Sequence, residues 1–254
     1  MSLIPKSHPR AKSLFIREKL VVGFENGLVA KEGLLAHGRG EAFDYLLGEK
    51  TRKAAKKAIK AAAAQILLAN SPIISVNGNI AALCPKEIVK LANISKAKIE
   101  VNLFYSSEKR KQCIVKVLKK SGAKEILGIN RNSSIKLPGL DSARRIVDKN
   151  GIFTADVVIV PLEDGDRTMA LRKAGKKVIT FDLNPLSRTS QTANITIVDN
   201  VTRAMDLLTL SCKKLSKRNK KILKEIMDEF NNKKNLSDSI IEIRDHLTRR
   251  SHIA

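Results

Sequence analysis

Short runs of β-branched residues alternate with helical stretches from Pro72 to about residue 200, and this alternation constrains the fold more than any other feature of the chain. Strands that alternate with helices form βαβ units, in which the strands lie parallel and helices cover both faces of the sheet. The runs 157–160 and 178–181 are almost entirely apolar, which is typical of strands buried on both faces. The expected fold class is therefore α/β, a Rossmann-like and mostly parallel sheet flanked by helices.

The chain has a helical pattern on either side of this core. Before Pro72, Gly27 is expected to end a first helix, and Thr51 to cap a long Ala/Lys helix that stops near Ala69. We expect a single α/β domain over residues 1–254, with a helical N-terminal part (1–70), a parallel-sheet core (71–200) and C-terminal helices (201–254). The expected strands are Ile73–Val76, Ile99–Phe104, Glu125–Gly128, Val157–Val160, Val178–Asp182 and Ile195–Val198, and the expected helices between them include Pro85–Ala92, Ser107–Lys120 and Asp166–Ala174.

The net charge of +23 is spread along the chain except over residues 151–200, which are neutral. A strongly basic protein can bind nucleic acid through its phosphates. Aromatic residues are only 4% of the chain, however, so platforms for stacking single-stranded bases are scarce. Most lysines fall on helical stretches such as 53–60 and 213–224, where a solvated helix face is the simpler interpretation. A basic nucleic-acid-binding protein therefore stays as the less favoured alternative.

Several classes of protein are excluded. No apolar run approaches the ~18 residues of a membrane helix, and the N-terminus lacks the apolar core of a signal peptide. The three cysteines, Cys84, Cys113 and Cys212, are single and odd in number, which rules out a disulfide framework and a zinc ribbon. We expect a cytoplasmic protein with no membrane partner and no metal-ligating cluster of its own.

The common phosphate-binding motifs are missing. There is no G-x-x-x-x-G-K-[ST], so the chain is not a Walker ATPase. Gly38-Arg39-Gly40 begins a G-x-G-x-x pattern, but Phe43 stands in place of the third glycine and the pattern follows a helix rather than a strand. An NAD-dependent oxidoreductase is therefore a weak interpretation.

Polar loops instead follow several of the expected strands, at 77–79, 161–168, 182–189 and 199–200. In parallel sheets ligands bind beyond the carboxyl ends of the strands, so these loops predict a binding site at one edge. Asp182 and Asn184 can bind ribose hydroxyls or an adenine edge, and Arg188 can pair with a phosphate. Asn184-Pro185 is equally natural as a plain turn. The neutral charge of this region suits a nucleotide held with Mg²⁺.

Two further clusters lie in the helical N-terminal part. In Ala36–Tyr45 two glycines stand beside His37 and Arg39, where the backbone can approach an anion, and Glu41 is expected to open a helix whose N-terminus favours negative ligands. The alternative is a plain helix–turn–helix with Arg39 in water. The segment 4–10 places two prolines among basic residues and is either a clamp on a phosphate or carboxylate, or a frayed terminus.

The chain resembles the archaeal 4-phosphopantoate–β-alanine ligases, also called phosphopantothenate synthetases. The resemblance spans nearly the whole chain, and runs such as HGRGEAFDYL and DLNPLSR are highly specific. The matching runs are IPKSHPR (4–10), REKL (17–20), GLLAHGRGEAFDYLLGEKT (33–51), SVNGN (75–79), VNLFY (101–105), VPLEDGDRT (160–168), VITFDLNPLSRT (178–189), ITIVDN (195–200) and LSDSIIEIRDHLTR (236–249).

This resemblance implies a homodimeric enzyme of coenzyme A biosynthesis. It would join 4-phosphopantoate to β-alanine with ATP and Mg²⁺, releasing AMP and diphosphate through an acyl-adenylate. The catalytic base stays open between His37 and Lys31. By resemblance, the ATP-binding positions are Arg17, Arg39, Asp182, Leu183, Asn184, Arg188, Thr189, Asp199 and Asn200. From charge and loop position, His8, Arg10, Lys31, His37 and Asn77 are expected near the phosphopantoate or the transferring phosphate.

Overall fold

The computed structural model describes residues 4, 5 and 7–252. The strands are β1 (Pro72–Val76), β2 (Lys98–Val101), β3 (Ser134–Lys136), β4 (Ile146–Asp148), β5 (Val157–Pro161), β6 (Lys177–Phe181) and β7 (Ile195–Ile197). The helices are α1 (Ala11–Glu25), α2 (Lys31–Leu47), α3 (Lys53–Leu68), α4 (Gly78–Leu83), α5 (Pro85–Ser95), α6 (Glu108–Lys120), α7 (Gly165–Lys173), α8 (Arg188–Thr192), α9 (Val201–Leu215), α10 (Lys220–Asp228) and α11 (Asn232–Ser251), with 3₁₀ turns η1 (Arg131–Ser133) and η2 (Ala143–Arg145). None of the described helices has the length and hydropathy that a membrane span requires.

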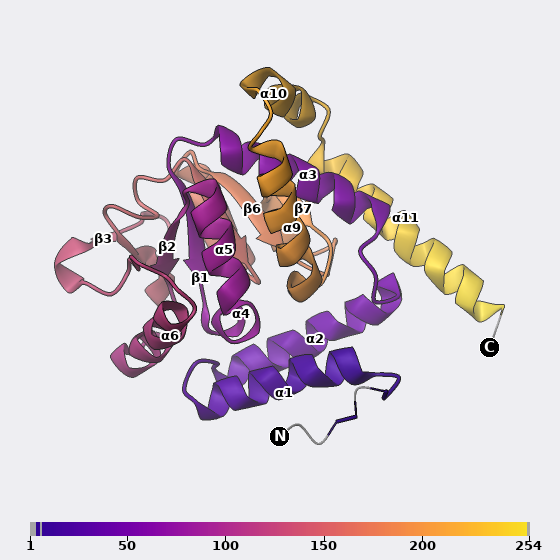
Figure 1. Cartoon of the computed structure of the whole chain (residues 1–254), viewed down its shortest axis with the longest axis horizontal. Helices are drawn as coiled ribbons and strands as arrows, with labels where there is room; N and C mark the ends of the chain where they lie inside the picture. Colours follow the sequence, from indigo (N-terminus) through magenta and orange to yellow (C-terminus); the bar gives the residue numbers. More distant parts are fainter. Residues whose placement is uncertain (1–3, 6, 253–254) are drawn as a thin grey trace.

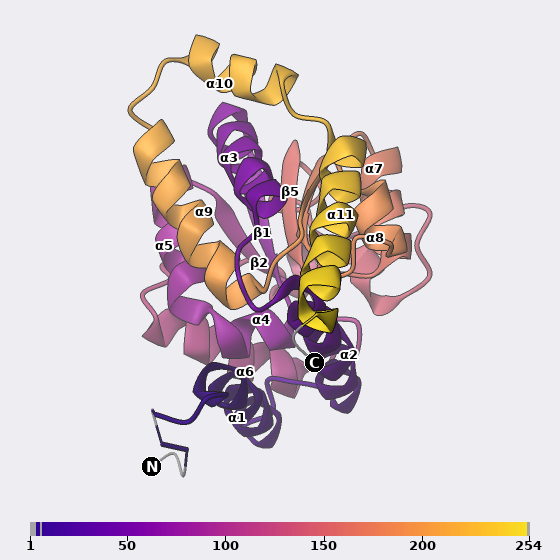
Figure 2. The same ribbon diagram turned by 90° about the vertical axis from the view of Figure 1, so that its right-hand side faces the viewer.

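A parallel sheet in the order β2-β1-β5-β6-β7 is the centre of the fold. The chain moves from β1 outward to β2, returns to β5, and then moves outward the other way to β6 and β7, so the direction of the connections reverses between β1 and β5. Helices α3, α5 and α9 cover one face, and α7 and α8 cover the other (Figures 1 and 2). The expected α/β class is confirmed, and the reversal marks where ligands bind in such sheets.

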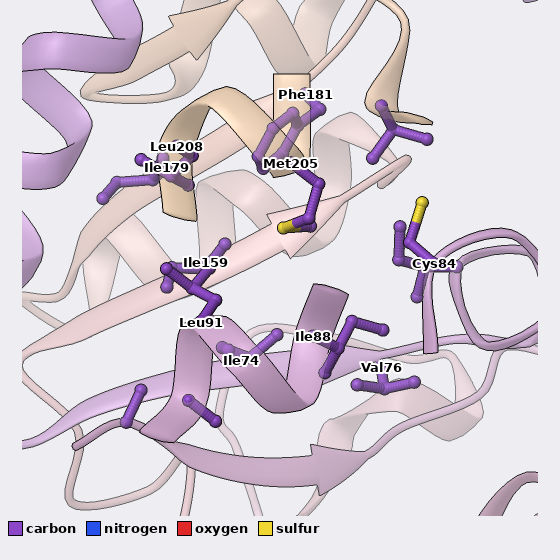
Figure 3. Close-up of a cluster of buried hydrophobic side chains, with 14 of the residues drawn as sticks. Ile74, Val76, Cys84, Ile88, Leu91, Ile159, Ile179, Phe181, Met205 and Leu208 are labelled. Atoms are coloured by element: carbon purple, nitrogen blue, oxygen red, sulfur yellow. The ribbon is translucent and has the colours of Figure 1, made fainter. Parts of the chain in front are cut away.

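Both faces of the central strands are buried, because successive side chains of a strand point to opposite faces. Ile74 and Ile159 face α5 and α9, whereas Ile73 and Val158 belong to a second apolar cluster with Leu171 of α7. Figure 3 shows the first cluster, in which the sheet residues meet Ile88, Leu91, Met205 and Leu208 of α5 and α9. The unbroken apolar runs therefore indicated burial on two sides correctly.

Helices α1 and α2 lie side by side across the carboxyl ends of the strands (Figures 1 and 2). The Asn79 amide, just after β1, donates to the Gly33 carbonyl of α2 at 2.8 Å. At the other end of the sheet, Arg203 of α9 pairs with Asp44 near the end of α2. Gly27 takes a left-handed φ of 72° just past Asn26, the C-cap of α1, as expected for the end of that helix. Helix α2 thus spans the carboxyl edge from the end of β1 to the start of α9, which follows β7.

Several sequence-based expectations about elements are wrong. Residues 125–128 form no strand but a single bridge, Glu100 to Leu127. Strand β2 ends at Val101 and not at Phe104, because its neighbour β1 gives way to α4 and offers no further partner. Thr51 does not cap α3; its hydroxyl donates to Asp199 instead, and Arg52 occupies the N-cap position. The β3–β4 hairpin, which is short and not apolar, was not expected from the sequence.

Candidate active site

The predicted loop around Arg39 is in fact the middle of helix α2. Gly38 and Gly40 are both helical, so Glu41 does not open a helix and no helix N-terminus faces a ligand there. Gly40 faces Leu183, because a Cβ atom added at Gly40 would lie 3.8 Å from the Leu183 side chain. Arg39 is exposed, and its positive charge acts on Asp182 in the loop after β6. Neither glycine is required for this packing, because a Cβ atom added at Gly38 would meet nothing within 4 Å and one at Gly40 would make an ordinary contact.

The loop after β6 is held by its own side chains. The Asp182 carboxylate accepts from the Asn184 backbone N–H at 2.9 Å and from the Ser187 hydroxyl. Burial raises the pKa of Asp182, while these hydrogen bonds and the charge of Arg39 act in the opposite direction. Asn184 accepts from the Leu186 N–H at 2.9 Å, so the turn interpretation of Asn184-Pro185 is confirmed.

Two more predicted residues tie this loop to the turn after β5. The Thr189 hydroxyl donates to the Glu163 carbonyl at 2.9 Å. Arg188 is exposed and its guanidinium lies 2.6 Å from the Asp166 carboxylate. Asp182, Arg188 and Thr189 thus lie in one segment, residues 182–189, at the carboxyl end of β6, with Arg188 exposed and Thr189 buried.

Asp199 and Asn200 anchor α2 to the sheet. Arg203 donates to both oxygens of Asp44, at 2.6 and 3.0 Å, and through Nε to Asp199 at 3.1 Å. Thr51 donates to the other Asp199 oxygen at 2.6 Å, and the Asn200 amide donates to Asp44 at 3.0 Å. Sequence reasoning missed Asp44 and Arg203. The available signals were the place of Asp44 within the motif of α2 and the i, i+4 spacing of Asp199 and Arg203.

Arg17 and His37 meet at the seam between α1 and α2. Arg17 Nε lies 3.1 and 2.9 Å from the two oxygens of Glu41, whose side chain is buried. The hydrogen bond to Glu41 raises the pKa of Arg17. Burial lowers the pKa of His37, with Glu41 opposing and Arg17 reinforcing that shift. Within the described residues, His37 Nε2 is buried and has no hydrogen-bond partner.

The remaining basic candidates lie at opposite ends of α2. Arg10 donates to the Tyr45 hydroxyl at 2.8 Å and stacks on its ring at 5.9 Å, and His8 Nδ1 accepts from the Arg10 N–H at 3.0 Å. Lys31 is the first residue of α2 and is exposed. At 1.5 Å per residue, Lys31 and Tyr45 are roughly 21 Å apart along the helix. One small substrate cannot contact both ends within a single chain. Lys6, in the same basic segment, lies outside the described residues.

A buried ionic cluster lies where the connections reverse between β1 and β5. The Glu163 carboxylate, 2% exposed, contacts the guanidinium groups of Arg144 and Arg167. Arg167 also donates to the Ser75 hydroxyl at 3.1 Å. Burial lowers the pKa of Arg144 to about 9 and that of Arg167 to about 10. Sequence reasoning singled out the 161–168 loop as a site without recognising this cluster.

Asn77 belongs to the same region but binds protein atoms. Its amide nitrogen donates to the carbonyls of Pro161 and Leu162, at 3.0 and 3.2 Å. Its amide oxygen accepts from the Ile80 N–H at 3.1 Å and caps α4. Both N–H groups of the Asn77 amide are therefore used within the protein. For a direct contact with substrate, Asn77 could offer only the second lone pair of its amide oxygen.

Comparison with known proteins gives a consistent result. The family model described as phosphopantothenate/pantothenate synthetase matches residues 54–246. A protein of Thermococcus onnurineus named 4-phosphopantoate–β-alanine ligase is 52% identical over 250 residues, which is 98% of this chain and 95% of the relative. Relatives of the same name from Thermococcus kodakarensis and Methanosarcina mazei are 53% and 50% identical over 247 residues, covering 97% of this chain and 94% and 96% of their own. The resemblance carried by the motifs is confirmed.

Proposed function

The chain belongs to the phosphopantothenate/pantothenate synthetase family, and we propose that it carries out the reaction of this family through an acyl-adenylate formed at the carboxyl edge of the sheet. It is a ligase that joins 4-phosphopantoate to β-alanine in coenzyme A biosynthesis, in an ATP-dependent reaction. Identities of 50–53% over nearly the full length carry this assignment.

We place ATP between α2 and the loop 182–189. The support is geometric: α2 crosses the ends of β6 and β7, and Arg39 is exposed and acts electrostatically on Asp182. Arg39 and Arg188 offer planar guanidinium groups that match phosphate oxygens. In this proposal the nucleotide site is completed by residues that hold its surrounding helices and loops in place, several of them through hydrogen bonds within the protein. They are Arg17, Asp182, Leu183, Asn184, Thr189, Asp199 and Asn200.

The acyl-adenylate route follows from the chemistry of the substrates. A carboxylate is a poor acylating group, so an oxygen of the 4-phosphopantoate carboxylate attacks the α-phosphate of ATP and diphosphate leaves. The amine of β-alanine then attacks the activated carbonyl, and AMP leaves. Positioning and neutralisation of the phosphate charge are the main demands on the protein. The proton that the attacking amine loses needs an acceptor. His37 is the better candidate for this base, because its Nε2 has no hydrogen-bond partner among the described residues and burial lowers its pKa, which favours the neutral ring; Lys31 is the alternative.

The residues fit Mg²⁺ only as an ion that accompanies the nucleotide. Among the described residues, no group of three or more His, Cys, Asp or Glu side chains could hold a metal ion. The Asp199 carboxylate is already paired with Arg203, and the Asp182 carboxylate is bonded within its own loop. Mg²⁺ that keeps several waters and binds mainly to ATP phosphates needs few protein ligands. It would supply neutralisation of the triphosphate charge.

A homodimer in the cytoplasm completes the proposal. Val21, Val22 and Phe24 of α1 and Leu35 of α2 are exposed, with Leu35 at 76%. Exposed apolar side chains on this helix pair are suited to contacts with a second copy of the chain. In this proposal a partner also brings a second set of basic side chains from the segment before α1, His8 and Arg10, within reach of 4-phosphopantoate. Light scattering of the purified protein tests the dimer.

Two assays of the purified protein test the reaction. With ATP and β-alanine, AMP should form with 4-phosphopantoate and much less with pantoate, which lacks the phosphate. Exchange of labelled diphosphate into ATP should require 4-phosphopantoate and proceed without β-alanine, because the acyl-adenylate forms before the amine acts. Release of ADP, or exchange that needs β-alanine, would contradict the acyl-adenylate. If kcat/KM for pantoate equalled that for 4-phosphopantoate, the result would contradict a binding site for the phosphate of 4-phosphopantoate.

A further inference from the structure

Leu162 adopts a conformation that its residue type avoids. It follows β5 directly, next to the reversal between β1 and β5, and has a left-handed φ of 54°. Such a φ is uncommon and costly for a residue with a branched side chain, because its Cβ crowds the backbone. A residue is held this way only where surrounding contacts impose it, and such positions concentrate at functional sites.

Asn77 supplies two such contacts, in addition to the hydrogen bond that the Leu162 N–H donates to the Phe181 carbonyl at 3.3 Å. Its amide nitrogen donates to the carbonyl of Leu162 and to that of Pro161, one residue before. The same side chain is fixed at its other end, because its oxygen caps α4 at the Ile80 N–H. The hydrogen bonds of Asn77 therefore link the end of β1 to the turn that follows β5. They cross the boundary between β1 and β5, where the direction of the connections reverses.

The Leu162 turn determines what Glu163 can reach. The Glu163 carboxylate points back into the protein between Arg144 and Arg167. The Glu163 backbone carbonyl accepts from the Thr189 hydroxyl at 2.9 Å. The next turn packs closely on the same loop, since a Cβ atom added at Gly165 would lie 2.6 Å from the Arg188 Cβ. A shift of Leu162 would therefore move the Glu163 carbonyl that binds Thr189 and the Gly165 backbone that packs on Arg188.

We propose that Asn77 is a positioning residue that holds Leu162 in the left-handed conformation and thereby sets the nucleotide loop 182–189, without contacting a substrate. This proposal rests on the assignment of ATP to that loop. It also replaces the sequence-based prediction that Asn77 binds 4-phosphopantoate.

The test is a double-mutant cycle read by ATP binding. Asn77→Ser keeps a good helix cap but is too short to reach the two carbonyls. In Leu162→Gly the glycine adopts a positive φ at little cost, so the turn does not depend on Asn77 to stabilise that conformation. Calorimetry measures the Kd for ATP in the wild type, in both single variants and in the double variant, and steady-state assays measure KM for each substrate. The effect of Asn77→Ser on the Kd is measured once with Leu162 present and once in the Leu162→Gly background. The packing energy lost with the leucine side chain is then the same on both sides of the second comparison and cancels.

We expect Asn77→Ser to weaken ATP binding about tenfold with Leu162 present, and less than threefold with glycine there. The matched control is Lys96→Gly, which relieves a left-handed φ of 57° at the end of α5. It should not restore ATP binding to Asn77→Ser, although it relieves the same kind of backbone cost.

Two results would overturn the positioning role. One is an equal loss of ATP affinity in both backgrounds. The other is a raised KM for 4-phosphopantoate with unchanged ATP binding, which would return Asn77 to substrate contact. A wild-type protein with no affinity for ATP would instead remove the nucleotide assignment itself, so the two failures are distinguishable.

Discussion

Replacing Arg203 with methionine should destabilise the protein strongly. The change keeps a long side chain but removes five N–H donors and one positive charge. Two carboxylates then lose their partner: Asp44 is 5% exposed and Asp199 is 1% exposed. Among the described residues, the hydrogen bonds that stay with these carboxylates come from the Asn200 amide, the Asn200 backbone N–H and the Thr51 hydroxyl.

The magnitude follows from the burial of those carboxylates. Removing one partner of a buried ion pair costs about 3–5 kcal/mol, because an uncompensated charge is left inside. At about 2–4 °C per kcal/mol for a chain of this size, the melting temperature should fall by roughly 6–20 °C. Since Arg203 also ties α2 to α9, the KM for ATP should rise in the fraction that stays folded.

Urea unfolding at pH 7 measures the free-energy difference. The matched control is Arg244→Met on α11, which breaks a pair with Asp245 at 2.7 Å between side chains that are 70% and 46% exposed. That control should cost no more than about 1 kcal/mol. Adding Asp44→Asn and Asp199→Asn to Arg203→Met should restore most of the lost stability, because no buried charge then stays unpaired. A loss as small as that of Arg244→Met would refute the anchoring of α2 through this pair.

Further outcomes are expected elsewhere. Arg39→Ala should lower kcat/KM roughly 10- to 150-fold through a lost charge-assisted contact, and Arg39→Lys less, with melting curves nearly unchanged because Arg39 is exposed; normal turnover in Arg39→Ala would remove its role. Burial raises the pKa of Glu100 to about 7, so the folded protein holds that proton more tightly than the unfolded chain and loses stability as pH rises from about 4.5 to 7. Relative to Glu100→Gln, the wild type should lose about 1–3 kcal/mol over that range in unfolding experiments, whereas parallel pH curves would contradict the assignment. Burial also raises the pKa of Cys84 and Cys212 to about 12, so a thiol reagent at pH 8 should modify half-buried Cys113 first, and prior labelling of either buried cysteine in the folded protein would contradict the core packing.

The sequence alone determined the class of fold and the edge of the sheet at which the polar loops gather. Runs such as 157–160 are apolar without alternation, and only a strand covered on both faces needs that pattern. Polar loops after β1, β5, β6 and β7 then had to gather, because the carboxyl ends of parallel strands share one edge. The family was also readable from the sequence, since long specific motifs survive along nearly the whole chain.

Tertiary structure decided what the polar residues at that edge do. Thr51 reads as a helix cap, yet its hydroxyl bonds Asp199, which is 148 positions away. Asn77 reads as a ligand-binding loop residue, yet its donors satisfy two carbonyls of another strand end. Local pattern reports how a side chain prefers to bond to its own turn, whereas a distant partner exists only after the strands have been placed in order. Burial then makes these long-range pairs compulsory, because a polar group removed from water must find a partner wherever the fold supplies one.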